Sequence, residues 1–117
     1  MPNASQLPLQ IVVAAHPPLH TSEADHQTAL RNIYEPLLQA LHRHPEVRLT
    51  LHFGGPLLDY LARHQEATLL GLGALRQRGQ IEILGGLFYG GLVSHLPEQD
   101  VRGQIEMARE FWESFLG

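Results

Sequence analysis

Three short apolar runs, each followed by a segment with helical spacing, constrain the fold more than any other feature of this sequence. The runs span residues 9–15, 47–53 and 80–84. The first is almost continuously apolar, which is typical of a parallel strand covered on both faces. The second alternates apolar with polar residues, and the third is a branched run between glycines, so both also predict strands.

The segments after these runs carry apolar residues at intervals of three and four, which predicts amphipathic helices. The first helix is expected to begin near Ser22, whose hydroxyl can cap it, and to end before Pro45. The second begins at Pro56 and is expected to break near 64–66, where polar residues interrupt the apolar stripe. The third begins at Pro97 and continues to the end of the sequence.

The order strand, helix, strand, helix, strand, helix has a direct consequence for the fold. Crossover connections of this kind are right-handed and produce a parallel sheet. The sequence therefore predicts an α/β fold in which repeated β-α units form a parallel sheet. Residues 1–8 are expected to form a flexible lead-in, and residues 9–117 to form one domain of three βα units.

Composition excludes several classes of protein. The formal net charge of −4, without a cluster of Lys and Arg, argues against nucleic-acid binding. No apolar run is long enough to span a membrane, and the first residues lack the charged start and apolar core of a signal peptide. The absence of Cys excludes disulfides and thiolate chemistry, and it fits a cytoplasmic location. No cofactor is expected, because Gly71 and Gly73 do not follow a strand as a dinucleotide loop requires.

The strand ends hold the candidate ligand-binding residues. In a parallel sheet the C-terminal ends of the strands lie along one edge, and binding sites are built there. His16 ends the first run, residues 52–55 end the second, and residues 82–89 cover the end of the third and the loop after it. Imidazole and carboxylate groups beside glycines and aromatic rings predict a polar ligand cleft at this edge. Glu82 is a particular candidate, because a carboxylate within an apolar strand is costly unless it is paired or faces a polar cavity.

Plainer interpretations of the same residues stay open. His16 and His52 could simply satisfy backbone groups near the strand ends, and Glu82 could pair with an Arg or a backbone amide. Composition alone favours the plainer interpretation of Glu82. A metal site made of His16, His52 and Glu82 is a further alternative, which is disfavoured because the sequence contains no paired-ligand motif.

Several short segments occur in the same order, and at consistent spacing, as motifs of a known enzyme family. They are His16–Leu19, Tyr34–Leu37, His52–Leu58, Arg78–Ile83, Phe88–Tyr89, Leu96–Asp100 and Gln104–Met107. Over nearly everything from the first strand onward, the sequence thus resembles the N-terminal part of glycoside hydrolase family 57. The resemblance is to its 4-α-glucanotransferase and α-amylase-like members in particular.

The resemblance implies a fold, an activity and a set of contacts. Members of the family use an incomplete β/α barrel of seven strands, and they cleave or transfer α-glucan chains with retention. It implies that His16 and Glu82 line the donor-sugar subsite, and that His52, Gly55 and Tyr89 also contact an α-glucan or maltooligosaccharide. The catalytic glutamate and aspartate of the family belong to later segments, so no catalytic residue is expected among these 117 residues.

The sequence also departs from the family pattern. The His that the family prefers two places before His16 is Ala14 here, and the Gln after His16 is Pro17. The family's Phe-Tyr-Glu-Pro is represented by Phe88-Tyr89-Gly90-Gly91, which removes an acid from the predicted edge. These departures change the expected contacts with sugar.

Three functions therefore stay open at this point. The chain could be the N-terminal segment of an α-glucan enzyme, inactive alone for want of both catalytic carboxylates. It could be a stand-alone degenerate homologue that binds oligosaccharide or another subunit without chemistry, or an unrelated α/β binding domain. Because a piece of a barrel leaves strand edges unpaired, we also expect self-association through the first or third strand, or pairing with a missing C-terminal half.

Overall fold

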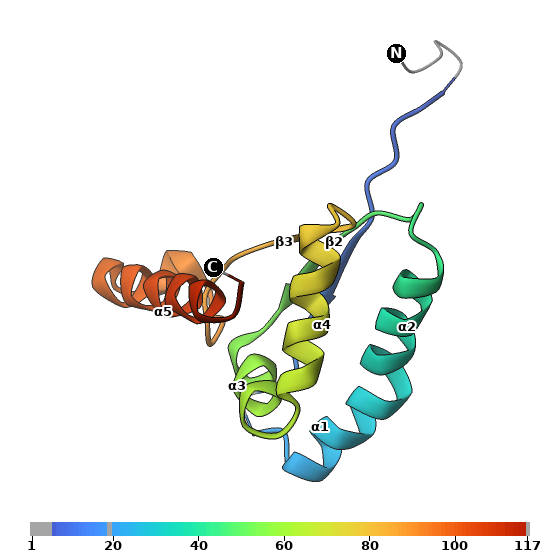
Figure 1. Cartoon of the computed structure of the whole chain (residues 1–117). Coiled ribbons are helices and arrows are strands. Elements are labelled where there is room, and N and C mark those ends of the chain that lie inside the picture. The colour runs from blue at the N-terminus through green and yellow to red at the C-terminus, as the bar shows by residue number, and fades with distance from the viewer. Residues whose placement is uncertain (1–5, 19, 117) are drawn as a thin grey trace.

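A parallel sheet of three strands lies at the centre of the fold (Figure 1). The computed structural model describes residues 6–18 and 20–116. Its strands, in sheet order, are β1 (Val12–Ala15), β2 (Leu49–Phe53) and β3 (Ile81–Ile83). The α/β class and the parallel sheet predicted from the sequence are therefore confirmed. The lead-in predicted for residues 1–8 lies partly outside the described residues.

Helices follow each strand, as the apolar spacing predicted (Figure 1). They are α1 (Glu23–Ala29), the π-helical turn η1 (Leu30–Tyr34), α2 (Glu35–Arg43), α3 (Gly55–His64), α4 (Glu66–Gln77), the 3-10 turn η2 (Val93–His95) and α5 (Glu98–Leu116). The predicted cap and break are both confirmed: the Ser22 hydroxyl accepts a hydrogen bond from the Asp25 N–H at 3.1 Å, and Gln65 separates α3 from α4. No helix in the described part of the chain combines enough length and apolar character to cross a membrane.

The first helical segment contains a π-helical turn that the sequence pattern did not predict. At the end of η1 the Glu35 N–H donates to the Leu30 carbonyl, five residues back. Pro36 follows within the first turn of α2. In an α-helix a proline has no N–H to donate, and its ring clashes with the carbonyl four residues earlier, here that of Asn32. The wider π-turn relieves this clash, which explains why the helix continues past a proline.

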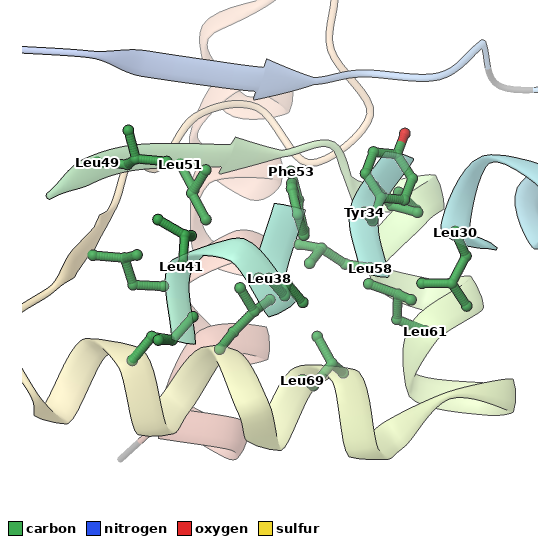
Figure 2. Close-up of a cluster of buried hydrophobic side chains, with 14 of the residues drawn as sticks. Leu30, Tyr34, Leu38, Leu41, Leu49, Leu51, Phe53, Leu58, Leu61 and Leu69 are labelled. Carbon is green, nitrogen blue, oxygen red and sulfur yellow. The ribbon is translucent and has the colours of Figure 1, made fainter. Parts of the chain in front are cut away.

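Leucine side chains fill the space between the sheet and helices α2, α3 and α4 (Figure 2). β2 contributes Leu49, Leu51 and Phe53 to this core, because alternate residues of a strand point to the same face. Leu58 from α3 and Leu69 from α4 pack against that face and are almost completely buried. The core therefore covers one face of the sheet.

The opposite face of the sheet is largely uncovered in the described part of the chain, and we call it the open face. Its strand residues are Val12, Ala14, Thr50, His52 and Glu82. Val12 is 52% exposed, whereas its neighbour Val13 points the other way and packs against the core. The prediction that the first strand is covered on both faces is therefore wrong. β1 is an edge strand, and helices cover one of its faces only.

Candidate functional site

A cavity of about 560 Å³ lies on the open face at the C-terminal ends of the strands. Its polar side chains are those of His16, which follows β1, and His52, which lies near the end of β2. The loop 84–87 and the side chains of Val101 and Ile105 from α5 form much of the remaining wall. The sheet edge at which the sequence predicted a cleft thus holds a cavity, which we call the strand-end cavity.

His52 is held by a hydrogen bond to the loop that follows β3. Its Nδ1 atom lies 2.9 Å from the carbonyl oxygen of Leu84. A carbonyl oxygen can only accept, so Nδ1 carries the proton and donates it. The other nitrogen, Nε2, is then an acceptor in the neutral imidazole. One nitrogen of His52 satisfies a backbone group near a strand end, as the plainer interpretation supposed, while the second is available to a ligand.

His16 lies in a slot between two glycines. A methyl group on Gly54 would lie 2.5 Å from His16 Nδ1, and one on Gly90 would lie 2.8 Å from His16 Nε2. Gly90 also has a φ of 79°, which other residues rarely adopt. The imidazoles of His16 and His52 meet edge to face, with ring centroids 5.7 Å apart. The two glycines therefore make the room in which the two imidazoles lie together.

Gly55, a predicted substrate contact, takes part instead in a close backbone approach. Its N–H donates to the Phe88 carbonyl at 2.6 Å. A methyl group at Gly55 would overlap both that carbonyl and the Phe88 ring. Gly55 is not among the residues that line the strand-end cavity. Its role in this structure is to hold the loop after β3 against the start of α3.

Glu82 lies on the same face as His52 but deeper in the sheet. β3 consists of Ile81–Ile83, and Glu82 is its middle residue, paired with Thr50 rather than with His52. Consecutive residues on one face of a strand are about 6.6 Å apart along the strand. The Cα atom of Glu82 therefore lies about 6.6 Å before the level of His52 in the strand direction. The predicted position of Glu82 at the strand end, level with His52, is corrected accordingly, because the register of β3 pairs Glu82 with Thr50, two residues before His52.

The surroundings of Glu82 also differ from those of the two imidazoles. It lines a separate cavity of about 250 Å³, together with Gln10 and Arg48, toward the N-terminal ends of the strands. Its side chain is exposed, and the ion pairs of the described residues do not include it. The structure thus brings His16 and His52 together and leaves Glu82 on the same face without a charged partner among the described residues.

Tyr89 lies beside the strand-end cavity rather than in its wall. Its N–H donates to Gln104 Oε1 at 2.9 Å, and its ring meets Phe88 edge to face at 4.9 Å. The Tyr89 side chain lines a different cavity, which it shares with His26 and Tyr60. The five predicted substrate contacts therefore do not form one cluster.

The apolar wall of the strand-end cavity was not predicted from the sequence. Val101 and Ile105 belong to the apolar stripe of α5, which the spacing assigned to a buried face as a whole. In the structure Ala108 is buried, whereas Ile105, one turn earlier, is 49% exposed at the cavity. The apolar stripe predicted that this side of α5 is buried. Which turns of α5 contact the core depends on where the helix lies against the sheet, which the spacing does not show.

Imidazoles and apolar side chains set the chemistry of the strand-end cavity. Among the described residues its lining has two imidazoles and a glycine-rich loop, but no carboxylate and no Lys or Arg. No group of three or more His, Cys, Asp or Glu side chains in the described part of the chain could hold a metal ion. The cavity thus offers imidazole and backbone hydrogen-bonding groups beside apolar side chains.

Comparison with known proteins identifies related enzymes. The chain is 32% identical over 96 residues to the 4-alpha-glucanotransferase of Thermococcus litoralis, an alignment that covers 82% of this chain and 15% of that enzyme. It is 29% identical over 102 residues to the alpha-amylase of Pyrococcus furiosus, covering 87% of this chain and 16% of that one. The chain therefore spans about one sixth or less of the length of these relatives, in their N-terminal part.

The fold agrees with a solved structure of one of these enzymes. The crystal structure of 4-alpha-glucanotransferase from Thermococcus litoralis matches with a TM-score of 0.86 and 30% sequence identity, over 90% of this chain and 17% of that chain. The sequence model of glycosyl hydrolase family 57 matches residues 5–117. A match over almost the whole sequence, together with the common fold, shows that this chain belongs to glycosyl hydrolase family 57.

Proposed function

We propose that this chain forms the first part of the sugar-processing barrel of an α-glucan-active family 57 enzyme, and that its strand-end cavity binds sugar units of an α-glucan or maltooligosaccharide. The observation that carries the proposal is the pair of imidazoles, 5.7 Å apart, in a cavity at the C-terminal ends of parallel strands. The names of the relatives, 4-alpha-glucanotransferase and alpha-amylase, supply the substrate class.

The lining of the strand-end cavity suits a sugar. A sugar ring has hydroxyl groups at its rim and C–H groups on its faces. The free Nε2 of His52 can accept a hydrogen bond from a hydroxyl, and the wall formed by Val101 and Ile105 can contact a C–H face. In this proposal Glu82 extends the same binding surface deeper into the barrel, while Gly55 holds the loop and Tyr89 borders it.

We further propose that the 117 residues do not catalyse glucan cleavage or transfer on their own. Retaining glycoside chemistry needs two carboxyl groups about 5–5.5 Å apart across the scissile bond. The described residues that line the strand-end cavity include no carboxylate, and Glu82 is the acid that the strands place on that face of the sheet. In this proposal the chain therefore binds the glucan but lacks the carboxylates that would cleave it.

The test measures binding and turnover on the purified chain. Maltotriose is titrated while the histidine ring signals are followed by NMR, and release of reducing sugar is assayed in parallel. We expect maltotriose to shift the signals of His16 and His52 without any turnover above buffer. His52→Phe keeps an aromatic ring but removes both nitrogens, so we expect about tenfold weaker binding.

His20→Phe is the matched control, because His20 is exposed and lies outside the lining of the strand-end cavity. Binding by this variant equal to that of the parent chain supports the assignment. Equal binding by the parent chain and His52→Phe contradicts it, as does the absence of any shift at His16 and His52. Reducing sugar released by the purified chain contradicts the proposed lack of activity.

A non-catalytic binding domain is the second candidate function, favoured by the exposed apolar side chains around the open face. These include Val12, Leu84, Val93 and Ile105. In this case the open face binds another subunit. The chain also binds glucan without catalysing a reaction, and we expect Glu82→Ala to abolish that binding. We place the protein in the cytoplasm in either case, since it has no Cys and therefore no disulfide framework.

A further inference from the structure

A second polar cavity lies apart from the strand-end cavity. It has a volume of about 250 Å³ and is lined by residues of α1, α3 and the loop after β3, including Glu23, His26, Asp59, Tyr60 and His64. α1 and α3 contact each other at this end of the molecule (Figure 1). None of its lining residues also lines the strand-end cavity. We call it the α1–α3 cavity.

Three rings in contact form one wall of the α1–α3 cavity. His26 stacks on Tyr60 with centroids 4.9 Å apart and an interplanar angle of 19°, and His64 packs on Tyr60 at 5.0 Å. His26 is 6% exposed and Tyr60 is 9% exposed. The rings of His26 and Tyr60 are thus fixed by packing, and their polar atoms have defined positions.

The polar atoms of the two buried rings, His26 and Tyr60, lack hydrogen-bond partners among the described residues. Among the described residues, neither the His26 ring nitrogens nor the Tyr60 hydroxyl makes a hydrogen bond. The same residues include one polar side-chain atom that is sealed from solvent without a partner, Gln80 Oε1, which lies elsewhere. His26 and Tyr60 therefore keep contact with solvent through the cavity that they line. Water can satisfy these groups while the cavity is empty, and a ligand whose hydroxyl groups make the same hydrogen bonds can displace that water.

The charges around the α1–α3 cavity compensate each other. Glu23 Oε1 lies 3.3 Å from His64 Nε2, and Asp59 Oδ2 lies 3.2 Å from an Arg63 nitrogen. The two carboxylates disfavour a phosphate or another anion. A metal ion is also disfavoured, because no suitable group of three donor side chains occurs in the described part of the chain. The lining suits a neutral ligand that both donates and accepts hydrogen bonds.

We propose that the α1–α3 cavity binds a single hexopyranose unit, with the Tyr60 hydroxyl and the His26 imidazole as its buried hydrogen-bonding groups. Each sugar hydroxyl can donate to Glu23 or Asp59 and accept from other groups of the lining. The volume of the cavity is at the small end for ligand sites, which favours one ring over a chain of rings. The chemistry of this cavity carries the inference independently of the strand-end cavity.

The test titrates glucose, methyl α-glucoside and the open-chain polyol sorbitol into the full 117-residue chain. The ring signals of His26 and His64 are followed by NMR. We expect a cyclic sugar to shift both signals and sorbitol to leave them unchanged. A response to glucose alone identifies a free sugar as the ligand, and a response to methyl α-glucoside as well identifies a unit of a glucan chain.

Two matched tyrosine variants connect the binding to the cavity. Tyr60→Phe keeps the stacked ring and removes the hydroxyl, so we expect about tenfold weaker sugar binding at His26 and His64. Tyr34→Phe makes the same change at a buried core residue outside this cavity, and we expect unchanged binding. His52→Phe also leaves the response of His26 and His64 unchanged, because His52 belongs to the strand-end cavity.

Three outcomes overturn the proposal. They are unchanged signals of His26 and His64 at the highest soluble sugar concentration, equal shifts with sorbitol, and equal affinity in Tyr60→Phe and the parent chain. If sugar shifts the signals of His16 and His52 alone, the α1–α3 cavity is not a sugar site, and the function proposed for the strand-end cavity stands.

Discussion

At the scale of single residues, the position of His16 depends on the absence of a side chain at Gly54. Gly54 has a φ of −66° and a ψ of 154°, which alanine adopts without strain. The effect of Gly54→Ala is therefore steric, since the new methyl group would lie 2.5 Å from His16 Nδ1. We expect a loss of about 1–3 kcal/mol in the free energy of unfolding, measured by urea denaturation, and a shifted His16 ring signal.

Gly71→Ala is the control for this prediction. Gly71 lies within α4, and a methyl group there would meet no atom within 4 Å. Alanine is a better helix former than glycine by about 0.5–1 kcal/mol, so we expect Gly71→Ala to stabilise the chain. If Gly54→Ala were as stable as the parent chain and its His16 signal unchanged, the slot described for His16 would be incorrect.

His26 gives the stability of the chain a pH dependence. Burial lowers the pKa of His26 below its ordinary value of 6.5, while nearby Asp25 opposes the shift. As the pH falls below about 6.5, the unfolded chain binds a proton at this residue before the folded chain does. The stabilising contribution is therefore complete above pH 6.5 and decreases as the pH falls through the lower pKa of the folded state.

We expect this slope to be smaller in His26→Gln than in the parent chain, because the titrating group is gone. The measurement is the melting temperature between pH 5 and pH 7.5, followed by circular dichroism. His20→Gln is the control, since His20 is exposed, and its profile is expected to follow that of the parent chain. A His26→Gln profile parallel to that of the parent chain would show that His26 does not carry the effect.

The site residues differ in how far the sequence could predict their positions. His16 and His52 were placed together because each follows or ends a strand, and strand ends in a parallel sheet lie at one edge. Glu82 was placed at the level of His52, but it pairs with Thr50, because the register between β2 and β3 is set by their pairing and not by the apolar run around Glu82. The direction of Tyr89 depends on the path of a loop with positive φ at Gly90 and Gly91, which spacing does not report.

At the scale of elements, Gln80 ties the end of α2 to the start of β3. Its Nε2 donates to the carbonyl oxygens of Leu41 at 2.5 Å and His44 at 2.9 Å. The Leu41 carbonyl also accepts from the His44 N–H at 3.3 Å and the His44 carbonyl from the Val47 N–H at 3.0 Å, so Gln80 gives each a second donor at the end of the helix. Gln80 is 3% exposed, and water cannot readily replace it.

We therefore expect Gln80→Leu to lower the free energy of unfolding by about 2 kcal/mol, since two hydrogen bonds of about 1 kcal/mol each are lost. Urea denaturation measures the change. Gln77→Leu is the matched control, because Gln77 is exposed at the end of α4, and we expect a change of at most about 0.5 kcal/mol. Similar losses in both variants would argue against a specific tie between α2 and β3.

Element types were predictable where periodicity was clear. The helix break at Gln65 follows from the polar residues that interrupt the apolar stripe, and the cap at Ser22 follows from its hydroxyl group. Both depend on neighbouring residues in the sequence. The π-turn before Pro36 was not predictable from spacing, because three- and four-residue intervals do not distinguish one extra residue per turn. The exposure of β1 was also missed, since an apolar run shows that a strand can be buried but not what covers it.

At the scale of the whole molecule, the open face is the part of the sheet that the described helices leave largely uncovered. The helices bury one face of the sheet, while Val12 at 52% and Leu84 at 48% exposure remain on the other side. The family relatives are several times longer than this chain, and the strand edges of β1 and β3 have no partner among its described residues. An uncovered apolar face beside free strand edges favours association.

We expect the isolated chain to self-associate through this face and the edge of β1. Sedimentation equilibrium is expected to give a mass above the 13.1 kDa of one chain that rises with concentration. Val12→Lys places a charge on the open face beside the β1 edge, and we expect it to reduce the mass toward that of one chain. Ile33→Lys is the control, because Ile33 is similarly exposed, at 57%, but lies on η1, away from the sheet. A parent chain that stays at 13.1 kDa at high concentration, or equal effects of the two lysines, would mean that the open face does not bind a second copy.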